Sequence, residues 1–243
     1  DLLKNNLKIF PEVVTFMNYK NFLTLGSKES DVLINGLSNS MYLAVITVLI
    51  GMPLSVVTGY ALARYKIKFK NLIISFILMT IVIPVFTTII PIYSFFMEHS
   101  MLDSMLWTSV IFISAFIPLN IWIIMNYFRE LPEDLWEAAA IEGANERQLF
   151  FQIGLPLAKP IVLTSSLVIF LMSWKQYIIP MLLLSSHNNK VLTLIMSEFM
   201  TRDAINYSVI AMSGIIVIIP PLLASIIFRK NLVSGLTAGS VKE

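Results

Sequence analysis

The sequence predicts an all-α integral membrane protein, a polytopic helical bundle with five membrane spans. Hydrophobic residues make up 57% of the 243 residues and charged residues only 13%, and the mean hydropathy is +0.80. Such a chain has little surface suited to water, so a soluble globular protein is excluded. A bilayer core about 30 Å thick needs about 20 apolar residues in helical form, and several segments reach that length.

Five spans are predicted, and the rest of the chain connects them. They cover residues 37–62, 72–95, 106–127, 161–184 and 207–228. The loop after the first span is basic, with Arg64, Lys66, Lys68 and Lys70 and no acidic residue, and the last span is followed by Arg229 and Lys230. Loops rich in lysine and arginine stay on the cytoplasmic side, so both are predicted to be cytoplasmic.

This orientation assigns the remaining segments. Residues 130–158, two crossings after the basic loop, and the tail 229–243 are predicted to be cytoplasmic. Residues 1–33, 97–105 and 185–206 are predicted to lie outside. No repeat, low-complexity tract or flexible linker divides the chain, so residues 1–243 are predicted to form one membrane domain.

The cytoplasmic segment 130–158 carries the signals of two short helices. Pro132 stands at a first-turn position, and Gly143 stands where a left-handed C-terminal cap is expected. Asn145 and Gln148 are spaced as a capping box, and Gly154 with Pro156 are predicted to stop the second helix. The prediction is a bent helical hairpin that is too short and too polar to enter the bilayer.

The composition of this hairpin favours contact with another protein. Its alanines give one side a flat surface that another backbone can approach closely. Apolar anchors are expected at Leu135, Trp136, Leu149, Phe150 and Phe151. The alternative is an amphipathic segment lying against the membrane surface, which gives no reason for the run of alanines beside a glycine.

Seven positions in this hairpin follow a long and specific spacing. They are Glu137, Ala138, Ala139, Gly143, Ile153, Leu155 and Pro156. With this spacing the segment resembles the cytoplasmic loop of permease subunits from binding-protein-dependent ABC importers. Four other stretches look like the carbohydrate branch, the maltose-type second permease. They are Tyr-Ala-Leu-Ala-Arg at 60–64, Phe-Arg-Glu-Leu-Pro at 128–132, Leu-Pro-Leu-Ala-Lys-Pro at 155–160 and Gly-Leu-Thr-Ala-Gly-Ser-Val-Lys at 235–242.

The resemblance covers nearly the whole chain and implies a type I ABC importer permease fold. Family members similar to this chain have one more helix before the first span predicted here, so a sixth span is expected at the N-terminus. The alternative is a true five-span protein. The resemblance also implies a multi-pass protein of the bacterial or archaeal cell (inner) membrane.

The resemblance further implies a role for the hairpin and a set of partners. The hairpin would be the coupling helix that seats in a groove of a cytoplasmic ATPase subunit, with Glu137 as a charge contact and Gly143 as the turn. The implied partners are a second permease subunit, two ATP-binding cassette ATPase subunits and an extracellular solute-binding protein. The chain has no Gly-x-x-x-x-Gly-Lys-Ser/Thr loop, so ATP and Mg are expected on the ATPase subunits and the chain itself is not expected to be an enzyme.

A candidate substrate pathway lies near the end of the fourth predicted span. Lys175 is the only charged residue inside a predicted span, and Trp174, Gln176 and Tyr177 flank it. Aromatic faces suit the apolar CH surface of a sugar, and amide and ammonium groups suit its hydroxyls. The alternative is that the aromatic residues form an interfacial belt and Lys175 extends to the membrane surface. Relatives often carry asparagine where Lys175 stands.

Other polar residues within the spans also have two interpretations. Asn120 is the foremost candidate for the pathway, with Asn126, Thr87 and Thr88. Each of them can instead form hydrogen bonds between helices. An amino acid, phosphate or polyamine remains an alternative cargo, because a coupling loop contacts the ATPase and not the substrate.

Several function classes are disfavoured. The chain has no cysteine, and its two histidines, His99 and His187, lack the spacing of a metal site. The spans contain no paired carboxylates and no Ser/His pair, which argues against an intramembrane enzyme. A passive channel requires a ring of polar or charged residues. No Lys/Arg run is long enough to bind nucleic acid.

Overall fold

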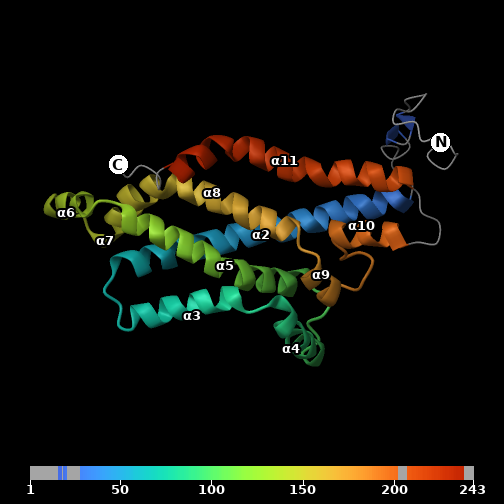
Figure 1. Ribbon diagram of the computed structural model, residues 1–243, viewed down its shortest axis with the longest axis horizontal. Helices are drawn as coiled ribbons and strands as arrows, with labels where there is room; N and C mark the ends of the chain where they lie inside the picture. The colour runs from blue at the N-terminus through green and yellow to red at the C-terminus, as the bar shows by residue number, and fades with distance from the viewer. Residues whose placement is uncertain (1–15, 18, 21–27, 202–206, 238–243) are drawn as a thin grey trace.

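The helical bundle predicted from the sequence is confirmed by the computed structural model, which describes residues 16–17, 19–20, 28–201 and 207–237. Within these residues, four helices are long and apolar enough to cross a membrane. They are Ser30–Arg64, Met105–Glu130, Glu146–Trp174 and Val209–Phe228. They run along the long axis of the molecule (Figure 1).

Helix α2 (Lys28–Arg64) is the centre of the bundle. It packs against α5 (Met105–Glu130), α8 (Leu155–Trp174) and α10 (Leu192–Thr201). Gly51, Ser55 and Gly59 are spaced four residues apart, so they share one face of α2, and small residues let membrane helices approach closely. A Cβ atom at Gly59 would lie 2.8 Å from Cγ2 of Ile124 on α5. The approach of α2 to α5 therefore depends on the absence of a side chain at Gly59.

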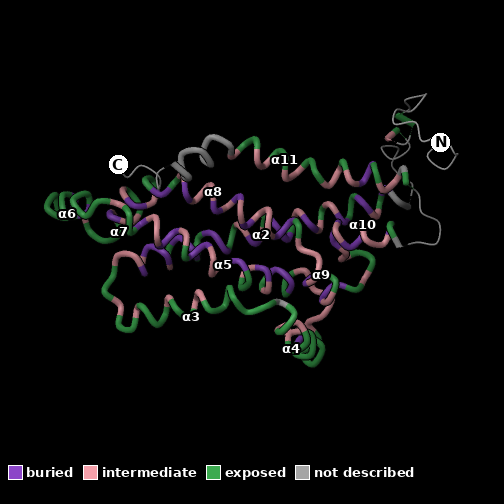
Figure 2. The backbone as a smooth tube through the Cα atoms, viewed as in Figure 1, coloured by how far each residue is buried: buried purple, intermediate pink, exposed green. Residues whose placement is uncertain are grey.

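The second predicted span, 72–95, is not one continuous helix. It divides into α3 (Lys70–Val82) and α4 (Val85–Glu98), which are bent by 93° relative to each other. The break lies at Pro84, which has no amide hydrogen, and proline disfavours helical angles in the residue before it. Ile83 accordingly has an extended ψ of 120°. Figure 2 shows that most of α3 and α4 is exposed or half-buried.

The fourth predicted span, 161–184, has different bounds at both ends. The helix begins at α7 (Glu146–Gln148), continues through the π-helical turn η1 (Leu149–Gly154) and ends with α8 at Trp174. The expected stop at Gly154 and Pro156 is wrong. Gly154 has helical angles, and the Leu155 amide bonds to the Phe150 carbonyl five residues back. One wide turn brings Pro156 into the first turn of α8, where its missing donor is tolerated.

Beyond Trp174 the chain turns into a separate short helix, α9 (Ile178–Leu183), followed by α10. Helix α11 (Tyr207–Thr237) packs against α8 and α10. It continues past residue 229, where the tail was predicted to begin, as far as Thr237. The remaining tail residues 238–243, and residues 1–15, 18, 21–27 and 202–206 of the predicted outer segments, lie outside the described residues.

The segments predicted to be cytoplasmic gather at one end of the bundle. The basic loop after α2, helix α6 (Glu133–Ile141), α7 and the last described turns of α11 lie there, whereas α4, α9 and α10 lie toward the other end (Figure 1). This arrangement is the one expected if the basic loop and the hairpin share one side of a membrane.

Candidate docking hairpin and membrane cavity

Helix α6 extends beyond the end of the bundle and ends in a tight reversal (Figure 1). Gly143 has a φ of +87°, which an L-side chain rarely adopts. The Gly143 amide donates to the Ala140 carbonyl and the Ala144 amide donates to the Ala139 carbonyl, each at 3.0 Å. These two bonds form a Schellman motif, so the predicted left-handed cap at Gly143 is confirmed.

The chain then enters α7 through the predicted capping box. The Gln148 amide donates to Asn145 Oδ1 at 3.0 Å, and the Asn145 amide donates to Gln148 Oε1 at 2.8 Å. The C-terminal end of α6 is therefore capped at Gly143, and the N-terminal end of α7 is capped at Asn145. A glycine turn with caps on both sides fixes the direction in which α6 points.

Three of the five predicted apolar anchors point inward. Trp136 and Leu149 are only 2% and 6% exposed, because they pack in the core at the root of the hairpin. Phe150 also packs against this core, with its ring centroid 4.9 Å from that of Tyr60. The exposed apolar side chains are instead Leu135, Phe151 and Ile141, the last of which is 87% exposed. Ile141 was not among the predicted anchors, although its place directly before the reversal indicates that it lies at the tip.

The hairpin positions singled out from the sequence divide between the tip and the root. Glu137, Ala138 and Gly143 are exposed, whereas Ala139 is buried against the root. The others lie away from α6, in η1 and at the start of α8. There Ile153 and Leu155 are half-buried and Pro156 is exposed. The accessible part of the predicted set is thus one side of α6 and its turn.

This exposed side combines acidic groups, two accessible alanines and large apolar groups on a short helix. Ala138 and Ala140 are exposed next to Glu137, and Leu135 and Ile141 flank them. Apolar groups gathered on an exposed surface mark interaction sites. The small alanine side chains allow a partner's backbone to come close. The arrangement is suited to docking on another protein.

A cavity of about 450 Å³ lies where the broken span faces α5 and α9. Its walls are apolar, with four polar side chains: Thr80, Thr88, Ser114 and Gln176. Among the described residues that line the cavity, none is ionisable. The Thr80 and Ser114 hydroxyls donate to carbonyls of their own helices at 2.7 and 2.8 Å. Their oxygen lone pairs remain able to accept hydrogen bonds from a ligand.

Of the predicted pathway residues, Thr88 and Gln176 line this cavity. Trp174 is buried between α8 and α11, with its indole nitrogen donating to the Val217 carbonyl at 3.2 Å. Tyr177 is half-buried, with its hydroxyl 3.3 Å from Ser197 Oγ. Because α8 ends at Trp174, the two rings do not share one helical face.

Lys175 is not inside a span. It is exposed and caps the C-terminal end of α8. Asn120 is completely buried, and its amide nitrogen donates to the Phe116 carbonyl at 2.9 Å. The spacing of polar residues did not predict that Thr80 and Ser114 line the cavity, because the break at Pro84 decides which helix faces meet.

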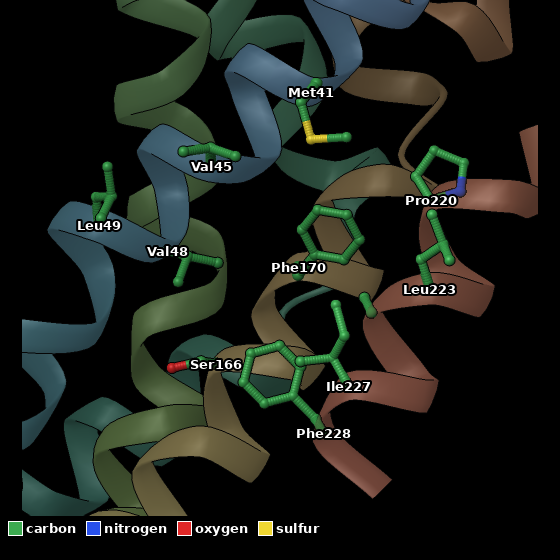
Figure 3. Close-up of a pocket in the computed structure, with 11 residues that line it drawn as sticks. Met41, Val45, Val48, Leu49, Ser166, Phe170, Pro220, Leu223, Ile227 and Phe228 are labelled. Carbon is green, nitrogen blue, oxygen red and sulfur yellow. The ribbon is translucent and has the colours of Figure 1, made fainter.

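A second hollow has a different chemistry. A groove of about 390 Å³ opens between α2, α8 and α11, and Figure 3 shows apolar side chains from all three helices along it. Its one polar side chain among the described residues, Ser166, donates its hydroxyl to the Val162 carbonyl at 2.7 Å. This groove suits lipid or another apolar helix and not a hydroxyl-rich solute.

The comparison with protein families settles the class of the chain. Residues 51–237 match the family described as "Binding-protein-dependent transport system inner membrane component". The chain belongs to this family. The matched residues of this permease include the whole hairpin, the cavity and the groove residues on α8 and α11, but none of the groove residues on α2.

Curated relatives of this permease cover it almost completely. The "Arabinooligosaccharides transport system permease protein AraQ" of Bacillus subtilis is 29% identical over 98% of this chain and 82% of its own length. The "Trehalose transport system permease protein SugB" of Mycobacterium tuberculosis is 28% identical over 97% of this chain and 85% of its own length. The AraQ protein of Halalkalibacterium halodurans is 26% identical over 100% of this chain and 85% of its own length.

Two solved structures have the same fold. A chain of a bacterial ABC transporter involved in the import of the acidic polysaccharide alginate superposes with a TM-score of 0.76 at 22% identity, covering 89% of this permease and 79% of that chain. A chain of the MetNI methionine ABC transporter gives a TM-score of 0.62 at 15% identity, covering 84% and 94%. The predicted type I importer permease fold is confirmed.

Proposed function

We propose that this chain is the transmembrane permease subunit of an ATP-driven importer that moves a sugar or oligosaccharide into the cell. The exposed face of α6, held by the Gly143 reversal at one end of the bundle, is the observation that carries this proposal. A rigid helix that presents its accessible side away from the bundle is what a separate motor subunit requires in order to push on the membrane helices.

In this proposal the hairpin is the coupling element. Glu137, Ala138 and Gly143 face a cytoplasmic ATPase subunit, and Ile153, Leu155 and Pro156 connect the hairpin to α8. Ala139 supports the helix from its buried side. The assembly contains a second permease, two ATPase subunits that hold ATP and Mg, and an extracellular binding protein that delivers the cargo. The assembly is located in the bacterial or archaeal cell membrane.

Carbohydrate is the favoured cargo for two reasons. The names of the relatives refer to arabinooligosaccharides and trehalose. In addition, the cavity offers hydroxyl and amide groups on apolar walls, with no ionisable side chain among its described lining residues. A neutral, hydroxylated ring suits such walls, whereas phosphate, a polyamine or a charged amino acid would lose its hydration without gaining an opposite charge.

The test uses the complete transporter in lipid vesicles, with its binding protein, and measures ATP hydrolysis and uptake. We expect stimulation by one or more neutral sugars from a panel that also contains amino acids, phosphate and polyamines. Stimulation by a charged solute, with no response to any sugar, would contradict the carbohydrate assignment.

A charge reversal tests the coupling role separately. Glu137→Arg on α6 is expected to abolish uptake and weaken co-purification of the ATPase subunits, because it replaces an acidic group on the exposed docking face with a basic one. Glu98→Arg is the matched control, since Glu98 is an exposed glutamate at the end of α4, away from the hairpin (Figure 1). Equal effects of the two substitutions would rule out a specific contact at Glu137.

A further inference from the structure

One buried aromatic ring, that of Tyr60, packs the carboxyl-terminal end of α2 against the root of the hairpin, where α6 and η1 meet the bundle. The Tyr60 ring centroid lies 5.2 Å from that of Phe128 on α5, 6.0 Å from Trp136 on α6 and 4.9 Å from Phe150 on η1. All three contacts have edge-to-face geometry, which aromatic pairs favour. Tyr60 is only 4% exposed. One side chain of α2 therefore contacts three other elements.

Arg64, one turn after Tyr60, adds a cationic contact. Its guanidinium carbon lies 4.5 Å from the centroid of the Trp136 ring, and the side chain is half-buried. Tryptophan is the aromatic residue that binds cations best, and partial burial strengthens the attraction. The contact joins the last turn of α2 to the inward side of α6.

The next residue joins α2 to α7. The Tyr65 hydroxyl donates to Glu146 Oε2 at 2.9 Å, and this hydrogen bond raises the pKa of Tyr65. Arg64, the last residue of α2, and Tyr65, the residue directly after it, thus contact both helices of the hairpin. The two contacts lie on opposite sides of the Gly143 turn.

The packing at this root has no spare room. A Cβ atom at Gly154, in the π-helical turn, would lie 3.2 Å from Cη2 of Trp136 and 3.4 Å from Cε2 of Tyr60. Trp136 itself is only 2% exposed. π-helical turns are rare and are found frequently at functional sites. Here the turn brings the start of α8 against the same two rings.

We propose that Arg64 is a positioning residue that, with Tyr60, joins the hairpin rigidly to α2, so that a force on α6 displaces α2 and does not bend the connecting loops. The inference rests on the proposed function of α6 as the docking element. Tyr60, Arg64 and Trp136 use the inward side of α6 only, so the exposed face with Glu137 stays available for the partner. If these contacts are weakened, α6 can still dock on its partner, but its displacement is no longer transmitted to α2.

The experiment measures sugar uptake and ATP hydrolysis in the same vesicles, with the complete transporter and its binding protein. For Arg64→Ala we expect the number of sugars imported per ATP to fall by about three- to tenfold, the range that loss of one cation–π contact predicts. ATPase co-purification and hydrolysis are expected to persist. Arg64→Lys, which retains a cation, is expected to restore most of the ratio.

The matched control is Lys66→Ala, which removes the same charge from an exposed position two residues later and is expected to leave the ratio unchanged. If Arg64→Ala fails to assemble, Trp136→Phe keeps a ring in the core but weakens cation binding, and it is expected to lower the ratio in the same direction.

Two results would overturn the proposal. One is an unchanged ratio in Arg64→Ala, including the case in which uptake and hydrolysis fall in parallel, because a merely stabilising role reduces the number of active transporters equally for both. The other is an equal loss of the ratio in Lys66→Ala. Failure of the unmodified transporter to hydrolyse ATP in response to any sugar would instead contradict the proposed function.

Discussion

At the scale of single residues, one backbone angle decides the direction of the docking helix. Gly143 has a φ of +87°, and a Cβ atom added there would meet nothing within 4 Å. The only barrier to a side chain at this position is therefore the backbone angle itself. Glycine adopts this angle freely, whereas a β-branched residue does not.

Gly143→Val is expected to strain the reversal by about 1 kcal/mol or more and to reduce uptake, because α6 changes direction. Gly143→Asn is expected to retain most of the activity, since asparagine tolerates left-handed angles. The control is Gly214→Ala in α11, where a Cβ atom also meets nothing within 4 Å and the angle is helical. Uptake assays check all three, and equal uptake by the Val and Asn variants would contradict the role of the angle.

A second residue-scale feature joins two loops at the end of the bundle opposite the hairpin. Asp103 Oδ1 accepts hydrogen bonds from the amides of Ser185 and Ser186 at 3.1 and 2.9 Å. Asn189 Nδ2 donates to the Asp103 carbonyl at 2.7 Å. Burial by itself raises the pKa of Asp103, but the donors from Ser186, Ser185 and Asn189 outweigh it and hold the pKa below its ordinary value.

This shift predicts a dependence of stability on pH. The folded-state pKa of the Asp103 carboxyl is lowered, so the ionised carboxylate adds to the free energy of unfolding. This contribution is fully present above the unfolded-state pKa of about 3.9 and is lost as the pH falls through the folded-state pKa. Asp103→Asn keeps the acceptor oxygen but not the charge. Thermal unfolding of the purified protein should show unmodified protein more stable than Asp103→Asn at neutral pH, with the difference disappearing below about pH 4. A constant difference across pH would refute the assignment.

At the scale of elements, close packing and prolines decide where the helices lie. Pro84 breaks the second predicted span, whereas Pro156 is absorbed because η1 places it in the first turn of α8. The contact between α2 and α5 depends on Gly59, where a Cβ atom would lie 2.8 Å from Ile124 Cγ2 and 3.0 Å from the Met125 amide nitrogen. A backbone atom cannot move aside as a flexible side chain can.

Gly59→Ala is expected to destabilise the bundle by about 1–3 kcal/mol, because α2 has to move away from α5. Gly51→Ala on the same face is the control, since its Cβ would lie at an ordinary 3.5 Å from Ile117 Cγ1. Thermal unfolding of the purified variants measures the difference. Equal stability of the two alanine variants would disprove the close approach at Gly59.

At the scale of the whole molecule, the two ends of the bundle have different chemistry. The basic loop after α2 and the hairpin lie at one end. The two loops that Asp103 joins by hydrogen bonds to Ser185 and Ser186 lie toward the other (Figure 1). The positive-inside rule assigns the basic end to the cytoplasm. The chain contains no cysteine, so single cysteines report this orientation without background.

Lys66→Cys and Glu142→Cys are expected to resist a membrane-impermeant thiol reagent added to intact cells, and Asn188→Cys is expected to react. All three positions are exposed, so burial does not explain a lack of reaction. Labelling of opened cells, in which all three should react, is the control. Labelling of Lys66→Cys in intact cells would show that the orientation is the opposite one and would exclude the coupling role of the hairpin.

The sequence by itself determined the features that depend on local chemistry. Apolar length and composition determined a helical membrane bundle, and the cap residues Gly143, Asn145 and Gln148 determined the turn, because each acts on backbone groups within a few residues. Tertiary structure alone decided which side of each helix is buried. Trp136 points inward and Ile141 outward, and Gln176 lines the cavity while Trp174 packs on α11. These outcomes depend on contacts between residues distant in sequence and on the 93° bend at Pro84, and neither periodicity nor composition encodes which helix will lie opposite another.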